Sequence, residues 1–138
     1  MLLVYIASPY SAPTQKARLK NVQKTMDAAI QLYYHGFAFI CPNLMHYLDE
    51  RATRIGKPLN WTDFMVIDLC QLARCDALLF LGSSPGTEME LKFARQRNIP
   101  VFYSIEELIL HNNQGNGTVI AYNKGDKKQL VTDNVSEG

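Results

Sequence analysis

The chain has 138 residues, of which 47% are hydrophobic and 20% charged, and its formal net charge is +1. This length suits one domain, and the small charge gives no reason to expect binding to nucleic acid or to a membrane surface. We expect no membrane span, because no apolar run approaches about 18 residues, and no signal peptide. The cysteines lack metal-like pairing, and Cys70 and Cys75 are expected to be buried free thiols, which is typical of the reducing cytoplasm.

The first half of the chain predicts two strands and a long helix. An apolar run at 2–7 predicts a strand buried on both faces. A helix over 14–35 follows the next loop and should end at Gly36. Five residues at helical spacing predict its buried face: Val22, Met26, Ala29, Ile30 and Tyr33. A second strand at 37–41 precedes an irregular segment, 42–60, with a short helix near 47–54.

The second half continues this alternation of strands and helices. Asn60 or Thr62 should cap a helix that runs to residue 73. A strand at 77–81, a helix at 87–96 and a strand at 100–103 follow. Ser104 and Glu107 have capping-box spacing and predict a short helix that ends near residue 111.

This order of elements predicts an α/β fold with a doubly wound, mostly parallel sheet of four to five strands, Rossmann- or flavodoxin-like, over residues 1–111. Residues 112–138 differ in character and predict a C-terminal extension. Within it we expect a linker at 112–117 and a hairpin whose strands, at 119–122 and 129–131, flank a turn at 123–126. Residues 133–138 are expected to fray.

Glu90 is the first candidate for chemistry. It lies near the start of the predicted helix 87–96, behind a Gly/Ser/Pro loop that follows a buried strand, where open α/β sheets bind ligands. It shares a face with Phe93 and Ala94 and should point inward, whereas Glu88 should point outward. In the first turn of a helix, the macrodipole should favour its ionised form, which a nucleophile or a stabiliser of positive charge needs. A solvated surface glutamate is the alternative.

Asp68 is the second candidate. On the predicted helix that ends at residue 73, it shares a face with Phe64, Met65 and Leu72. Burial should raise the pKa of this carboxyl group and make it a proton donor near neutral pH. The alternative is an aspartate with structural hydrogen bonds, and Asp76 is expected to be a turn or capping residue. Trp61 is interpreted as a core residue, or else as an aromatic ring that stacks on a base.

Two loops should meet at the carboxyl edge of the sheet. Their hydroxyl and N–H groups, with one arginine, would form a cradle for an anion. The residues concerned are Ser8, Tyr10, Ser11, Arg18, Ser84 and Gly86. His46 and Asn43 are candidates to line the same cleft, and a purely structural role is the alternative for the histidine.

These motifs resemble the nucleoside 2-deoxyribosyltransferase-like superfamily, which includes the deoxyribosyltransferases and the nucleoside 5′-monophosphate N-glycosidases, over residues 2–104. The Ser-Pro-Tyr-Ser loop is similar to that of a small bacterial and phage branch. The family's nucleophile is a glutamate in a Gly-x-x-x-Glu-Leu context; Gly86 to Leu91 match it, which implies this role for Glu90. The family's second acid is an aspartate eight residues before the aspartate that precedes the strand. Asp68 and Asp76 have this spacing, which implies that Asp68 protonates the leaving base.

The resemblance implies hydrolysis of the N-glycosidic bond of a nucleoside 5′-monophosphate. Six residues before the nucleophile, deoxyribosyltransferases tend to carry aspartate and the hydrolases serine. Ser84 stands there, which favours a phosphate surrounded by Ser8, Ser11, Arg18 and Ser84. The alternatives are base exchange by a deoxyribosyltransferase and a non-catalytic nucleotide sensor. A plain Rossmann redox domain is disfavoured, because no G-x-G-x-x-G motif follows the first strand.

The resemblance also bears on partners and cofactors. It implies a small-molecule nucleoside or nucleotide as ligand, no metal or other cofactor, and a homodimer or larger homo-oligomer. Four aromatic residues are candidates for the contact between copies: Tyr33, Tyr34, Phe37 and Tyr47.

Overall fold

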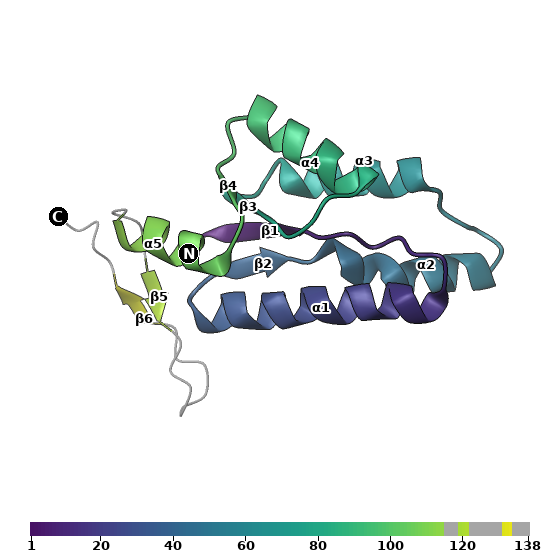
Figure 1. Ribbon diagram of the computed structural model, residues 1–138, viewed down its shortest axis with the longest axis horizontal. Coiled ribbons are helices and arrows are strands. Elements are labelled where there is room, and N and C mark those ends of the chain that lie inside the picture. Colours follow the sequence, from purple (N-terminus) through teal and green to yellow (C-terminus); the bar gives the residue numbers. More distant parts are fainter. Residues whose placement is uncertain (115–118, 122–130, 134–138) are drawn as a thin grey trace.

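A four-stranded sheet forms the centre of the protein. The computed structural model describes residues 1–114, 119–121 and 131–133. All four strands are parallel and lie in the order β2-β1-β3-β4 (Figure 1). They are β1 (Leu3–Ala7), β2 (Ala38–Ile40), β3 (Ala77–Phe80) and β4 (Val101–Phe102). This arrangement confirms the predicted doubly wound α/β fold.

Helices cover both faces of this sheet. One face carries α1 (Gln15–Tyr34) and α5 (Ile105–Gln114), and the other carries α3 (Trp61–Leu72) and α4 (Pro85–Gln96) (Figure 1). From Val4 to Ala7 the strand β1 is buried, because its side chains alternate between two faces that helices both cover. Val4 and Ile6 pack against α1 and α5, while Tyr5 packs on the side of α3 and α4.

The segment after β2 is more regular than predicted. A 3-10 turn, η1 (Pro42–Leu44), leads into α2 (Met45–Arg54). The predicted short helix thus begins earlier than residue 47. In Figure 1, α2 lies beyond the carboxyl ends of the strands, where it forms one wall of the site described below.

A crevice forms at the carboxyl end of β1, because the strands that follow it in the chain, β2 and β3, lie on opposite sides of it. From β1 the chain crosses to β2 on one side, while β3 pairs with β1 on the other. The loops that follow β1 and β3 approach closely at this point, and Leu81 N–H donates to Ala7 C=O over 2.8 Å. Gly82 permits this approach, since a Cβ there would lie 3.0 Å from Pro9 Cδ.

Capping residues fix the helix starts. Asn60 and Asp63 form a reciprocal capping box at α3, as the sequence suggests for Asn60. Ser84 and Thr87 do the same at α4, which therefore begins at Pro85 rather than at residue 87. Proline suits the first helical position, where no N–H bond is required. Glu90 consequently lies in the second turn of α4 and not in the first.

Several predictions of burial are wrong. The buried face of α1 consists of Val22, Thr25, Ala29 and Leu32. Ile30 is 56% exposed, because it lies to one side of this face. Phe37 is in the core and is not available for contact with another copy. Cys70 is exposed, whereas Cys75 is buried as expected.

The C-terminal part contains a second, two-stranded antiparallel sheet of β5 (Val119–Ala121) and β6 (Val131–Asp133). This confirms the predicted pair of strands, with the second strand displaced from 129–131. The predicted turn at 123–126 lies outside the described residues, as does the end of the chain beyond Asp133. Helix α5 extends to Gln114, past the predicted end at residue 111. Among the helices described, none is both long and apolar enough to cross a membrane.

Candidate functional site

A cavity of about 420 Å³ opens at the carboxyl ends of β1 and β3. Its volume falls in the range of small-molecule sites. The loop after β1, the start of α4, one side of α3, and α2 with η1 form its walls. Every predicted site residue except Arg18 lines it: Ser8, Tyr10, Ser11, His46, Asp68, Ser84, Gly86 and Glu90. Asn43 lines it as well. Residues dispersed over the chain are thus brought together, although their chemical roles remain predictions.

Glu90 lies at the inner end of this cavity and is only 5% exposed. It points inward as predicted, and Glu88 is exposed. The expectation for its protonation is wrong, however. The pKa of Glu90 is raised to about 8: burial raises it most, a hydrogen bond from Tyr5 opposes the shift, and the neighbouring Asp68 adds to it. In the second turn of α4, burial outweighs the modest influence of the helix macrodipole.

Asp68 lies on α3 and faces the same cavity. Burial raises its pKa to about 7, in agreement with the prediction for this residue. Its Oδ1 atom is buried and has no hydrogen-bond partner among the described residues. Since an unpartnered carboxylate oxygen is costly to bury, this environment favours the protonated acid. Asp76, expected as a turn or capping residue, instead joins two distant segments, because its Oδ2 accepts the N–H of Leu3 over 2.8 Å.

Tyr5 is a site residue that the sequence did not reveal. It is fully buried on β1, and its hydroxyl donates to Glu90 Oε2. Burial and the adjacent carboxyl groups of Glu90 and Asp68 raise its pKa far above the usual range. The phenol therefore remains a proton donor at all ordinary pH values. An apolar strand run gives no signal for such a contact, because the partner lies on a distant helix.

The side of the cavity at α4 offers polar groups to an anion. Ser8 is 6% exposed, and its Oγ has no partner among the described residues. Ser84 caps α4, where its Oγ accepts from Thr87 N over 3.2 Å. Helix N-termini attract anions. Arg18 is absent from the cavity lining, and its Nη1 donates instead to Ala12 C=O over 2.9 Å.

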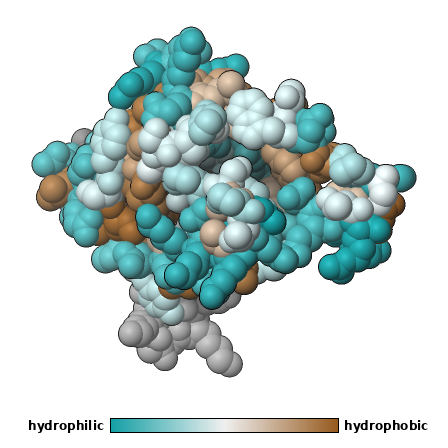
Figure 2. Space-filling model, turned by 45° about the vertical axis from the view of Figure 1, so that its right-hand side comes forward, coloured by the Kyte–Doolittle hydropathy of each residue, from teal (hydrophilic) through white to brown (hydrophobic). Residues whose placement is uncertain are grey.

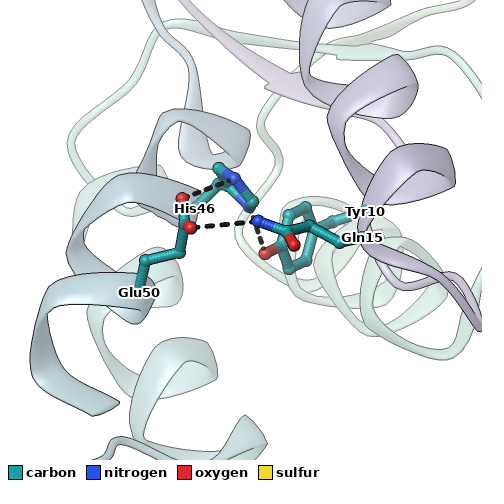
Figure 3. A network of polar contacts seen from close by, with 4 residues as sticks. All are labelled: Tyr10, Gln15, His46 and Glu50. Carbon is teal, nitrogen blue, oxygen red and sulfur yellow. Dashed lines mark hydrogen bonds and ion pairs between the residues drawn. The ribbon is translucent and has the colours of Figure 1, made fainter. Parts of the chain in front are cut away.

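A polar network connects the loop after β1 to α2 (Figure 3). The Tyr10 hydroxyl and His46 Nδ1 are 2.8 Å apart. His46 Nε2 lies 2.9 Å from Glu50 Oε1, one turn further along α2. Gln15 Nε2 donates to the other oxygen of Glu50 over 3.2 Å. His46 is thus almost wholly buried and has partners on both ring nitrogens.

Part of the cavity lining is apolar. Its side chains are Met45, Leu59, Trp61, Phe64 and Met65. Trp61 is 49% exposed, so its interpretation as a core residue is wrong. Gly86 faces this apolar part, and a Cβ on it would lie 3.6 Å from Met65 Sδ. In Figure 2, which turns this end of the molecule forward, hydrophobic surface lies among hydrophilic side chains.

The fold and the cavity define a doubly wound α/β protein with two carboxyl groups, that of Glu90 buried and that of Asp68 half-buried, at the switch point of its sheet. A family model described as "Domain of unknown function (DUF7768)" matches residues 2–104, and the chain belongs to this family. Comparison with curated proteins finds no match. Within the part of the chain that is described, no group of three or more His, Cys, Asp or Glu side chains has the arrangement of a metal site.

Proposed function

We propose that the protein hydrolyses the N-glycosidic bond of a nucleoside 5′-monophosphate. The observation that carries this proposal is the pair of acids, Glu90 and Asp68, which consecutive helices bring to one cavity. Cleavage of a glycosidic bond requires a carboxylate that stabilises positive charge at the sugar and an acid that protonates the leaving group. The resemblance to nucleoside N-glycosidases assigns these two roles to the same residues.

The contacts of the two acids support a division of labour. Each ionised carboxyl group opposes ionisation of the other, so the pair gives up its first proton more readily than its second. Taken separately, the pKa values of about 7 and about 8 would ionise Asp68 first. The hydrogen bond from Tyr5 is already part of the value for Glu90, so the order that the reaction needs depends on the substrate. Positive charge that develops at C1′ beside Glu90 would favour the anion of this residue.

The reaction then proceeds in two steps. Asp68 gives its proton to a nitrogen of the base as the bond between that nitrogen and C1′ breaks, and an oxygen of Glu90 bonds to or stabilises C1′. In the second step a water molecule adds its oxygen to C1′, returns a proton to the Asp68 carboxylate and frees Glu90. The products are the free base and ribose 5-phosphate or its deoxy counterpart.

The polar side of the cavity supports a phosphorylated substrate. Ser8 presents an unused hydroxyl, and the N-terminus of α4 contributes to the same cavity lining. Ser84 brings a hydroxyl rather than a carboxylate to this place, so no charge at that position repels a dianion. Because Arg18 is turned toward Ala12, this phosphate site would rely on hydroxyl and N–H groups.

Chromatography of reaction mixtures tests the proposal. The protein is incubated with a panel of nucleosides and their 5′-monophosphates, and release of free base is measured. We expect release from monophosphates only, and none by Glu90→Ala. An added second nucleobase distinguishes base exchange, since a deoxyribosyltransferase would form a new nucleoside. Binding without any turnover would favour the nucleotide sensor and would refute the proposed hydrolysis.

A further inference from the structure

A tyrosine in the loop after β1 lines the cavity, and a histidine on α2 holds its hydroxyl in one orientation. Tyr10 lines the cavity, and its hydroxyl lies 2.8 Å from Nδ1 of the buried His46 (Figure 3). Glu50 holds the other ring nitrogen of this histidine at 2.9 Å. None of these contacts involves Glu90 or Asp68, so the proposed reaction leaves the network without a role.

The network determines which group of Tyr10 faces the cavity. An ionised Glu50 can only accept a hydrogen bond, so Nε2 of His46 must carry the hydrogen. In the neutral imidazole, Nδ1 is then an acceptor, and Tyr10 must donate its hydroxyl hydrogen to it. Burial raises the pKa of Tyr10, which keeps the phenol protonated. Tyr10 therefore has no hydrogen left to donate to a ligand, and its oxygen, which also accepts a side-chain hydrogen bond from Arg18, offers its remaining lone pair.

A second acceptor lies in the same part of the cavity. Asp49 follows His46 on α2, lines the cavity, and is close enough to raise the pKa of Tyr10. The other charged groups that act on Tyr10 are Glu50, already bonded to His46, and Arg18, which donates to Ala12. The α2 side of the cavity thus combines two hydrogen-bond acceptors, and Trp61 and Phe64 supply apolar surface in the same cavity.

We infer that Tyr10 and Asp49 select a nucleobase that carries an exocyclic amino group. This inference rests on the proposed nucleotide ligand. The flat base would lie on the apolar surface of Trp61 and Phe64 and direct its amino hydrogens toward the two acceptors. A base with a carbonyl group at the same position would place its own acceptor oxygen against the acceptors Tyr10 and Asp49, and no hydrogen bond could form. Tyr10 and Asp49 are specificity residues here, and His46 is a positioning residue that acts through Tyr10.

Matched pairs of nucleotides isolate the amino group. Adenosine and inosine 5′-monophosphates differ at the purine position 6, which bears an amino group in one and a carbonyl in the other, and cytidine and uridine 5′-monophosphates differ likewise at position 4. Sites built to bond a polar group reject the analogue that leaves their own groups unpaired. We expect at least one amino nucleotide to bind about tenfold or more tightly than its carbonyl partner.

Titration calorimetry measures these affinities, with Glu90→Gln as the background that prevents turnover. In that background, Tyr10→Phe and Asp49→Asn should each reduce the preference for the amino nucleotide over its carbonyl partner to within about threefold. Asp49→Asn also adds a donor and should improve binding of the carbonyl nucleotide. Tyr103→Phe is the matched control, because the Tyr103 hydroxyl bonds Arg95 outside the cavity lining and its loss should leave the preference unchanged. Circular dichroism checks that each variant is folded.

The outcomes separate this inference from the proposed function. Equal affinities within both pairs, a preference for the carbonyl partner, or no binding of any of the four nucleotides would overturn the inference. So would a preference that survives both Tyr10→Phe and Asp49→Asn. Base release from all four nucleotides at equal affinity would overturn the inference alone. An amino preference in a protein that never releases base would overturn the proposed hydrolysis alone.

Discussion

The hydroxyl of Tyr5 donates a hydrogen bond to Oε2 of Glu90, and 85 residues of sequence separate the two side chains. Tyr5 is fully buried on β1, whereas Glu90 projects from α4 into the cavity. The bond therefore fixes one carboxylate oxygen against the core of the fold. It leaves the other oxygen of the carboxyl group available to a ligand, which is the arrangement that an oriented nucleophile needs.

Removal of this donor should slow the reaction. Tyr5→Phe keeps the ring in the core and removes only the hydroxyl. We expect kcat to fall about 10- to 100-fold, as for the loss of one preorganised hydrogen bond at a reacting group. Because the hydrogen bond lowers the pKa of Glu90, the variant should raise that pKa and move the acidic limb of the rate profile to higher pH. Tyr103→Phe removes a hydroxyl that binds Arg95 outside the cavity and serves as the control. An unchanged rate and pH profile in Tyr5→Phe would contradict the role given to Tyr5.

Glu90 should destabilise the protein at alkaline pH. Its pKa rises from 4.5 to about 8 on folding. A carboxyl group with a raised pKa stabilises the folded state fully below about pH 4.5, and this contribution is lost as the pH rises through about 8. Glu90→Gln cannot ionise and should be more stable than the wild type near pH 9, by on the order of 4 kcal/mol. Urea unfolding across this pH range measures the difference, which should shrink toward pH 4.5. A gap that stays constant with pH would show that folding does not raise the pKa of Glu90.

The effect of removing Asp68 on the hydrolysis rate should depend on the leaving group. Asp68→Asn removes the proposed proton donor, so hydrolysis of nucleotides whose bases leave poorly should slow about 100-fold or more. A p-nitrophenyl glycoside of ribose 5-phosphate needs no protonation, and the variant should hydrolyse it at nearly the wild-type rate. Glu90→Gln should fail with both kinds of substrate, because its role lies at the sugar. Equal losses for the two substrates in Asp68→Asn would argue against general acid catalysis by this residue.

Gly86 offers a test of the cavity itself. A methyl group there would lie at ordinary contact distance from Met65 Sδ (3.6 Å) and Trp61 Nε1 (3.8 Å). Gly86→Ala should therefore fold normally and gain up to about 1 kcal/mol of stability from the lower conformational entropy of the unfolded chain. The same methyl group narrows the cavity, so KM should rise several-fold while kcat changes less. Thermal unfolding and steady-state kinetics on one preparation separate the two effects, and an unchanged KM would indicate that the substrate does not approach α4 at this point.

Local chemistry in the sequence predicted much of the fold. Three features depend only on residues close in sequence and could be predicted from them. They are the apolar run of β1, the cap of α3 by Asn60, and the end of α1 at Gly36, which has a φ of +91°. The errors arise where two local signals compete. Glu90 was assigned to a first turn because the loop looked as if it continued through Pro85, but a proline at the first helical position extends α4 backwards.

What the sequence did not reveal depends on contacts between distant segments. The bond between Tyr5 and Glu90 and the exposure of Trp61 at the cavity follow from how α3 and α4 pack on the sheet. The same packing raises the pKa of Glu90, which a helix considered alone would lower. The clustering of Ser8, His46 and Asp68 was predictable because the carboxyl ends of parallel strands meet at one edge, but the path of α2 was not.

The most direct test of the central claim compares wild type with Glu90→Gln on nucleoside 5′-monophosphates, with free base and ribose 5-phosphate measured by chromatography and affinity by calorimetry. The account predicts that wild type releases both products and that the variant binds the same nucleotides with similar affinity but releases neither. Base release by the variant at the wild-type rate, or no release from any monophosphate by the wild type, would contradict it.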